Sequence, residues 1–213
     1  MASIKIPPRI PPTKIEQTLD DYKKDKSRRI PTSTNCKIKL YWWEPKGSVT
    51  KPKLISNIIS DCITTCMKYY PLLTFVHDAT PLILNDSKET TERYRRQIYY
   101  KASALLNVLP TESAFAHVCV TSTGLVGRPG ILTNGLARRE TGVACFSTAN
   151  GGGAKILVHE LAHLFGLRHC SDTSCIMKAG EESSFKKLID KNEPSEFCDI
   201  CQSKLAICFN KFS

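Results

Sequence analysis

The string H-E-L-A-H-L-F-G-L-R-H at residues 159–169 constrains the fold of this chain more than any other feature of its sequence. His159 and His163 are separated by one helical turn, so on a helix both imidazoles point from one face and can share a single cation. Gly166 can adopt a left-handed conformation that ends the helix and turns the chain back. His169 is then placed to be a third ligand. The string therefore predicts a helix that carries a metal site and stops shortly after it.

Glu160 lies one residue away from the first histidine. That offset suits a carboxylate that holds a metal-bound water instead of binding the metal itself. A bare H-E-x-x-H also arises on surface helices, where two solvated histidines and an ion-paired glutamate involve no metal. The additional glycine and third histidine argue against this alternative.

Four cysteines follow the third histidine closely, namely Cys170, Cys175, Cys198 and Cys201. Thiolates in two close pairs suit a closed tetrahedral site that contributes folding free energy. Two disulfides are the alternative. We expect reduced thiols, because the first residues contain no apolar run of a secretory signal and the chain has no apolar run of 18 residues. The sequence thus predicts an intracellular protein, cytoplasmic or nuclear, without a membrane partner.

Positive charge is concentrated near the N-terminus. Residues 1–53 contain 13 Lys or Arg and 5 Asp or Glu, whereas residues 54–213 contain 17 and 15. Residues 1–34 are also rich in proline and offer no apolar face, so we expect a basic, mobile arm ahead of one catalytic domain at 35–213. Nucleic-acid binding through this arm is an alternative that we do not favour, because aromatic residues are not interleaved with the arginines.

The hydrophobic pattern alternates between strands and helices, which predicts an α/β arrangement. Strands are expected at 36–42, 72–77, 115–121 and 142–147, with a short edge strand near 131–136, and helices at 54–69, 88–107 and 154–167. The remaining histidines and four further cysteines are expected to be core residues: His77, His117, Cys62, Cys66, Cys119 and Cys145.

The motifs resemble those of a known family. H-E-x-x-H-x-x-G-x-x-H is the metzincin pattern, and the archaemetzincins join it to a following cysteine, a C-x-M and a later C-x-x-C. Here these read H-E-L-A-H-L-F-G-L-R-H-C, C-I-M and C-D-I-C. The resemblance is specific over residues 153–205, including Lys204 and Leu205, looser over 94–147, and absent from the arm.

This resemblance implies a ligand set. The catalytic zinc would be bound by His159, His163 and His169, with Glu160 as general base, and a structural zinc by Cys170, Cys175, Cys198 and Cys201. Met177 would form the methionine turn of the metzincins, although a methionine is commonly a core residue. The implied fold is an α/β (α+β), metzincin-like twisted mixed sheet flanked by helices, with a small C-terminal element, residues 170–201, that holds the structural zinc.

The function implied is that of a zinc-dependent metallopeptidase that hydrolyses peptide bonds with zinc-activated water. We expect a monomer with two zinc ions, Zn2+, per chain and a peptide or protein substrate bound as an added strand in a cleft. The alternative is a zinc-stabilised module that binds peptides or proteins with little or no turnover. The presence of Glu160 argues against it, because a pure binder has no need of that carboxylate.

Overall fold

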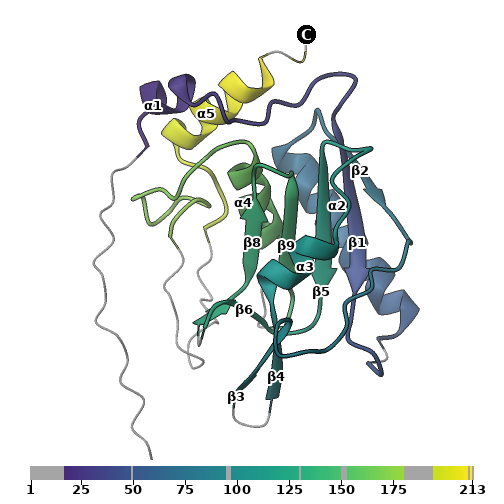
Figure 1. Cartoon of the computed structure of the whole chain (residues 1–213). Helices are drawn as coiled ribbons and strands as arrows, with labels where there is room; N and C mark the ends of the chain where they lie inside the picture. The colour runs from purple at the N-terminus through teal and green to yellow at the C-terminus, as the bar shows by residue number, and fades with distance from the viewer. Residues whose placement is uncertain are drawn as a thin grey trace, which may run out of the picture.

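A five-stranded mixed sheet forms the centre of the computed structural model, which describes residues 17–48, 50–94, 97–129, 131–149, 153–179, 194–210 and 212 (Figure 1). The strand order is β2-β1-β5-β9-β8. The bounds are β1 Lys37–Trp43, β2 Thr74–His77, β5 Ala116–Thr121, β8 Gly135–Arg138 and β9 Val143–Ser147. Four strands run parallel, and β8 pairs antiparallel with β9 at one edge. The mixed sheet expected from the sequence is confirmed.

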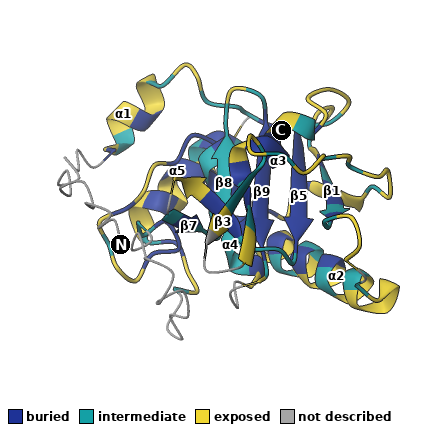
Figure 2. Ribbon diagram, turned by 60° about the horizontal axis from the view of Figure 1, so that its bottom comes forward, coloured by how far each residue is buried: buried dark blue, intermediate teal, exposed yellow. Residues whose placement is uncertain are grey.

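Helices cover both faces of this sheet. Helices α2 (Pro52–Tyr69) and α4 (Ala154–Leu164) pack on one face and α3 (Ala102–Val108) on the other (Figure 1). Side chains of β1 point alternately to the two faces of the sheet and so contribute to two hydrophobic clusters. Ile38 and Leu40 belong to the cluster under α2 and α4. Tyr41 and Trp43 belong to the cluster under α3. Strands β5 and β9 are buried throughout (Figure 2). Helix α4 thereby rests on a rigid sheet.

A second sheet replaces most of the long helix that the sequence predicts at 88–107. Its order is β3-β4-β6-β7, with bounds β3 Thr91–Tyr94, β4 Gln97–Lys101, β6 Leu125–Arg128 and β7 Ile131–Thr133. The helix prediction is wrong before residue 102. Thr91 pairs with Tyr100 in a hairpin, and β-branched and aromatic residues of this kind fit a pleated surface. Ile98 on β4 is exposed, although an apolar residue of a helix at 88–107 would be expected to face the core.

The N-terminal segment is better packed than its composition suggests. Residues 17–34 were expected to be part of a mobile arm, and for them that expectation is wrong, while residues 1–16 lie outside the described part. Helix α1 (Leu19–Lys24) begins with a capping box between Thr18 and Asp21. Tyr22 is fully buried and anchors the helix. Tyr22 is thus a buried aromatic anchor in a segment that has no apolar stripe.

Helix α5 (Asp199–Phe209), which the sequence analysis did not predict, packs beside α1 although the two helices lie at opposite ends of the described chain (Figure 1). Of the expected core residues, His117 is buried and hydrogen-bonded to Tyr41, and the four cysteines are buried. His77 is exposed on edge strand β2, so the core prediction is wrong there. Within the described residues, no helix is both long and apolar enough to cross a membrane.

Candidate active site and metal centres

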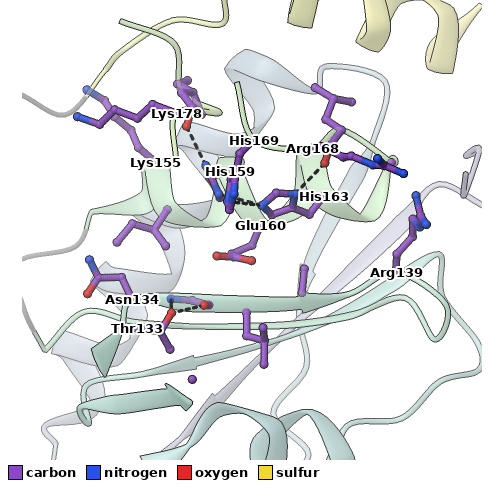
Figure 3. Close-up of a pocket in the computed structure, with 18 of the residues that line it drawn as sticks. Thr133, Asn134, Arg139, Lys155, His159, Glu160, His163, Arg168, His169 and Lys178 are labelled. Atoms are coloured by element: carbon purple, nitrogen blue, oxygen red, sulfur yellow. Dashed lines mark hydrogen bonds between the residues drawn. The ribbon is translucent and has the colours of Figure 1, made fainter. Parts of the chain in front are cut away.

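Helix α4 presents two of the three motif histidines on one face, and the third meets them from the following loop (Figure 3). The Nε2 atom of His163 lies 3.0 Å from Nε2 of His159 and 3.2 Å from Nε2 of His169. The structure thus brings together the three imidazoles that the sequence predicts to be ligands.

The turn that returns the chain to His169 is a Schellman motif. The N–H of Gly166 donates to the carbonyl of His163, and the N–H of Leu167 donates to the carbonyl of Ala162, both at 3.0 Å. Gly166 has φ +93°, a left-handed conformation that residues with a side chain rarely adopt. The glycine therefore ends α4 after Leu164, three residues earlier than the periodicity alone indicates.

The hydrogen bonds of the first two histidines fix their tautomers. Nδ1 of His159 lies 2.8 Å from the carbonyl oxygen of Ile176, and Nδ1 of His163 lies 2.7 Å from that of Leu167. A carbonyl only accepts, so Nδ1 carries the hydrogen and Nε2 has a free lone pair. Burial lowers the pKa of His159 to about 4 and that of His163 to about 3, which keeps both rings neutral at pH 7.

These tautomers test whether a metal fits. Two neutral Nε2 acceptors 3.0 Å apart cannot hydrogen-bond to each other, because neither carries a hydrogen there. A cation between them would satisfy both lone pairs, and Nε2 of His169 lies close enough to join as a third ligand. Imidazole nitrogens with backbone-anchored Nδ1–H groups are the usual donor set for zinc. The histidine cluster therefore fits a zinc ion.

Glu160 lies on the sheet side of the histidines (Figure 3). It is 6% exposed, and burial raises its pKa to about 8. A cation bound by the neighbouring imidazoles favours the carboxylate and counteracts that shift. The carboxylate is close to the site without needing to be a ligand, which is the arrangement expected of a proton acceptor.

Gly135 on β8 is a site residue that the sequence analysis missed. A Cβ placed on it would lie 2.5 Å from Oε1 of Glu160. Only glycine at this position of β8 therefore leaves room for the carboxylate. A glycine inside a predicted edge strand is the one sequence signal of such a close approach. The contact depends on how α4 packs against β8, which the local pattern does not contain.

An open cavity of about 770 Å³ lies in front of the histidines and Glu160. Strands β7 and β8 form one wall, α4 and the loop through His169 the other. Lys155 and Lys178 lie to one side of the histidines and Arg139 and Arg168 to the other (Figure 3). The volume is that of a ligand-sized cleft.

The four predicted cysteines also come together. Their Sγ atoms all lie within 4.8 Å of one another, and Sγ of Cys170 is 3.7 Å from that of Cys198. A zinc–sulfur bond of about 2.3 Å implies tetrahedral sulfur–sulfur distances of about 3.8 Å. Sγ of Cys175 accepts the N–H groups of Met177 and Cys198 at 3.4 Å. The thiol cluster fits a closed metal site.

Met177 lies two residues after Cys175, between the two cysteine pairs along the chain. Its side chain is fully buried, and its carbonyl accepts the N–H of Cys170 at 2.6 Å. The preceding residue, Ile176, supplies the carbonyl that anchors His159. The C-I-M segment thereby supports a ligand of the histidine cluster through its backbone while contributing a thiol to the other cluster.

Comparisons with known proteins agree with this geometry. Residues 153–207 match the family model of Peptidase family M54. Archaemetzincin-2 of Macaca fascicularis is 41% identical over 54 residues, a match that covers 24% of this chain and 13% of that protein. The match therefore spans only a small part of this curated relative.

Solved structures extend the similarity to the fold. The archaemetzincin of Methanopyrus kandleri superposes with a TM-score of 0.65 at 24% identity, over 84% of this chain and 98% of that chain. The archaemetzincin of Archaeoglobus fulgidus, complexed with malonate, gives 0.57 at 21% identity over 79% and 99%. A zinc-dependent peptidase of Methanocorpusculum labreanum gives 0.54 at 20% identity over 79% and 99%. The chain has the fold of these proteins.

Proposed function

We propose that this relative of the archaemetzincins is a zinc metallopeptidase that hydrolyses peptide bonds, with Glu160 as its general base. The convergence of three Nε2 atoms beside a buried carboxylate supports the proposal most directly. Zinc held by His159, His163 and His169 would make water acidic enough to lose a proton near neutral pH and would polarise the peptide carbonyl. The donor sets support two zinc ions per chain, the second held by the four cysteines.

Glu160 has two tasks in this proposal. Its carboxylate accepts the proton of the attacking water and then delivers that proton to the leaving amine nitrogen. Strand β8 limits where the carboxylate can lie, since even a Cβ at Gly135 would lie 2.5 Å from Oε1 of Glu160. A buried position also keeps bulk water from competing for the carboxylate.

The substrate would lie along β8. This strand is at the edge of its sheet within the described residues, and its residues line the cavity in front of the histidines. An extended peptide can pair with such an edge as an additional strand, so that backbone hydrogen bonds supply affinity. We propose a monomer in a reducing, intracellular compartment, because a closed site of four thiolates requires reduced cysteines.

Peptide-library cleavage by the zinc-loaded protein tests the proposal. Full-length wild type and Glu160→Gln are compared at equal zinc content, with products identified by mass spectrometry. We expect turnover to fall by about 10²- to 10⁴-fold in the variant, the usual contribution of a general base. Glu112→Gln, at an exposed glutamate outside the cavity, serves as the matched control and should cleave like wild type.

Two outcomes contradict the proposal. Equal cleavage by wild type and Glu160→Gln would remove the general-base role. No cleavage by either protein, with both zinc ions bound, would favour the peptide-binding module without turnover.

A further inference from the structure

The turn before His169 is held from outside by the side chain of Gln17. Nε2 of Gln17 donates to the carbonyl of Gly166 at 3.1 Å, and Oε1 accepts the N–H of Arg168 at 3.2 Å. Gln17 is only 3% exposed. Both ends of one carboxamide are thus used on the backbone between the second and third histidines.

Helix α1 and the residues that follow it add further contacts to the same turn. The hydroxyl of Tyr22, fully buried, donates to the carbonyl of Phe165 at 2.9 Å. A Cβ on Gly166 would lie 2.8 Å from Cγ of Arg28, so this side chain packs directly on the glycine. The segment at residues 17–28 therefore supports the turn through several independent contacts.

A buried lysine of α5 holds Gln17 in turn. Lys204 is 3% exposed, and its Nζ donates to the main-chain carbonyl of Gln17 at 2.5 Å. Burying an ammonium is costly unless it is hydrogen-bonded, so this lysine restricts where Gln17 can lie. Lys204 follows Cys201 by one turn on α5, the helix whose first residues come directly after Cys198. Gln17 accordingly lies between the turn of the histidine cluster and the helix of the thiol cluster.

His169 depends on its backbone more than the other two histidines do. His159 and His163 are fixed by α4, which rests on the central sheet, whereas His169 is exposed and lies in a loop. A metal ligand outside regular structure needs neighbouring groups to orient it, and such supporting groups affect metal affinity strongly.

We propose that Gln17 is a positioning residue for His169, and that Lys204 couples it to the helix of the cysteine cluster. The inference rests on the histidine zinc site of the proposed function. It concerns metal affinity, which is measured without any peptide, so it is tested separately from turnover.

The test measures zinc affinity of the full-length chain by competition with a chelator. Gln17→Met keeps most of the side-chain volume but loses both hydrogen bonds, and Gln17→Ala loses the packing as well. We expect each to weaken zinc binding at the histidines by about 10- to 100-fold, the usual effect of losing a group that orients a ligand. Gln97→Ala, at an exposed glutamine on β4, is the matched control and should bind like wild type.

Cobalt substitution separates positioning from general stability. Cobalt bound by thiolates has a charge-transfer absorption that cobalt bound by imidazoles lacks, so the two sites are read independently. We expect Gln17→Met to alter the imidazole-bound spectrum while the thiolate absorption stays as in wild type. Lys204→Met should weaken zinc at the histidines in the same direction but less, since Gln17 keeps its own hydrogen bonds.

Three results would overturn the inference. Unchanged zinc affinity at the histidines in Gln17→Met, with wild type binding two zinc ions, removes the hydrogen-bonding role and leaves the proposed function intact. Equal weakening at both sites indicates a merely structural role. A wild-type chain that binds zinc only at its thiols overturns both this inference and the proposed function.

Discussion

The two candidate metal sites are adjacent in the chain and opposite in character. The histidine cluster faces a cavity of about 770 Å³, and His169 is exposed. In the cysteine cluster, by contrast, Cys175 and Cys201 are essentially inaccessible. An open site leaves a coordination position for substrate, and a closed one stabilises the fold. Because His169 and Cys170 are consecutive, the closed site also restrains the backbone of the open one.

Removing one thiol should have the largest effect. Cys201→Ser takes a ligand from the closed site, and structural zinc contributes on the order of 10 kcal/mol, as much as the whole stability of many domains. We expect lower zinc content at both sites and a much lower melting temperature. Cys36→Ser, at a half-exposed cysteine outside the cluster, is the control. Wild-type melting and two bound zinc ions in Cys201→Ser would mean that the sites are not coupled.

Crowding Glu160 should affect only the open site. Gly135→Ala places a Cβ against the carboxylate and displaces it, and a misplacement of about 1 Å can lower turnover by up to about 100-fold. Zinc content and melting temperature should stay near wild type. In Gly127→Ala the new Cβ meets its nearest atom, on Thr133, at 3.4 Å, so turnover should be nearly unchanged. Loss of zinc from Gly135→Ala would show that the glycine supports the metal site and not only the base.

The mildest test removes the metal with a chelator and changes no residue. A chelator added to the fully loaded protein should remove zinc in two phases, first from the open histidine site and later from the buried thiols. Turnover should disappear with the first phase, while the melting temperature falls with the second. Release of both metals in one phase would contradict the division into an open and a closed site.

The parts that sequence could predict are those whose geometry is local. His159, His163 and Gly166 are related by one helix and its end, so their spacing alone indicates that they meet. The strand at 36–42 follows from its alternation of apolar and basic residues, and the strand at 115–121 from a short apolar run. Residues 91–101 form a hairpin instead of the predicted helix, and β4 also pairs with β6, a partner that the local pattern does not contain.

Gly135 and Gln17 could not be found in this way. Gly135 contributes to the site because α4 packs against β8 there. Gln17 contributes because its carboxamide hydrogen-bonds to a turn 149 residues away in the sequence. Residues 17–34 contain a single fully buried aromatic residue within a polar run, and a polar run without an apolar stripe is read as an arm. Long-range contacts of individual polar groups leave no periodic signal.

The hydrogen bond from Lys204 to Gln17 joins groups 187 residues apart, which bears on the order in which the protein is built. During synthesis the histidine motif leaves the ribosome before the second pair of cysteines and before α5. At that stage Gln17, which contacts the turn ahead of His169, lacks its bond from Lys204, and the thiol cluster has only Cys170 and Cys175. The four thiols can meet, and Lys204 can hold Gln17, only after α5 has been synthesised.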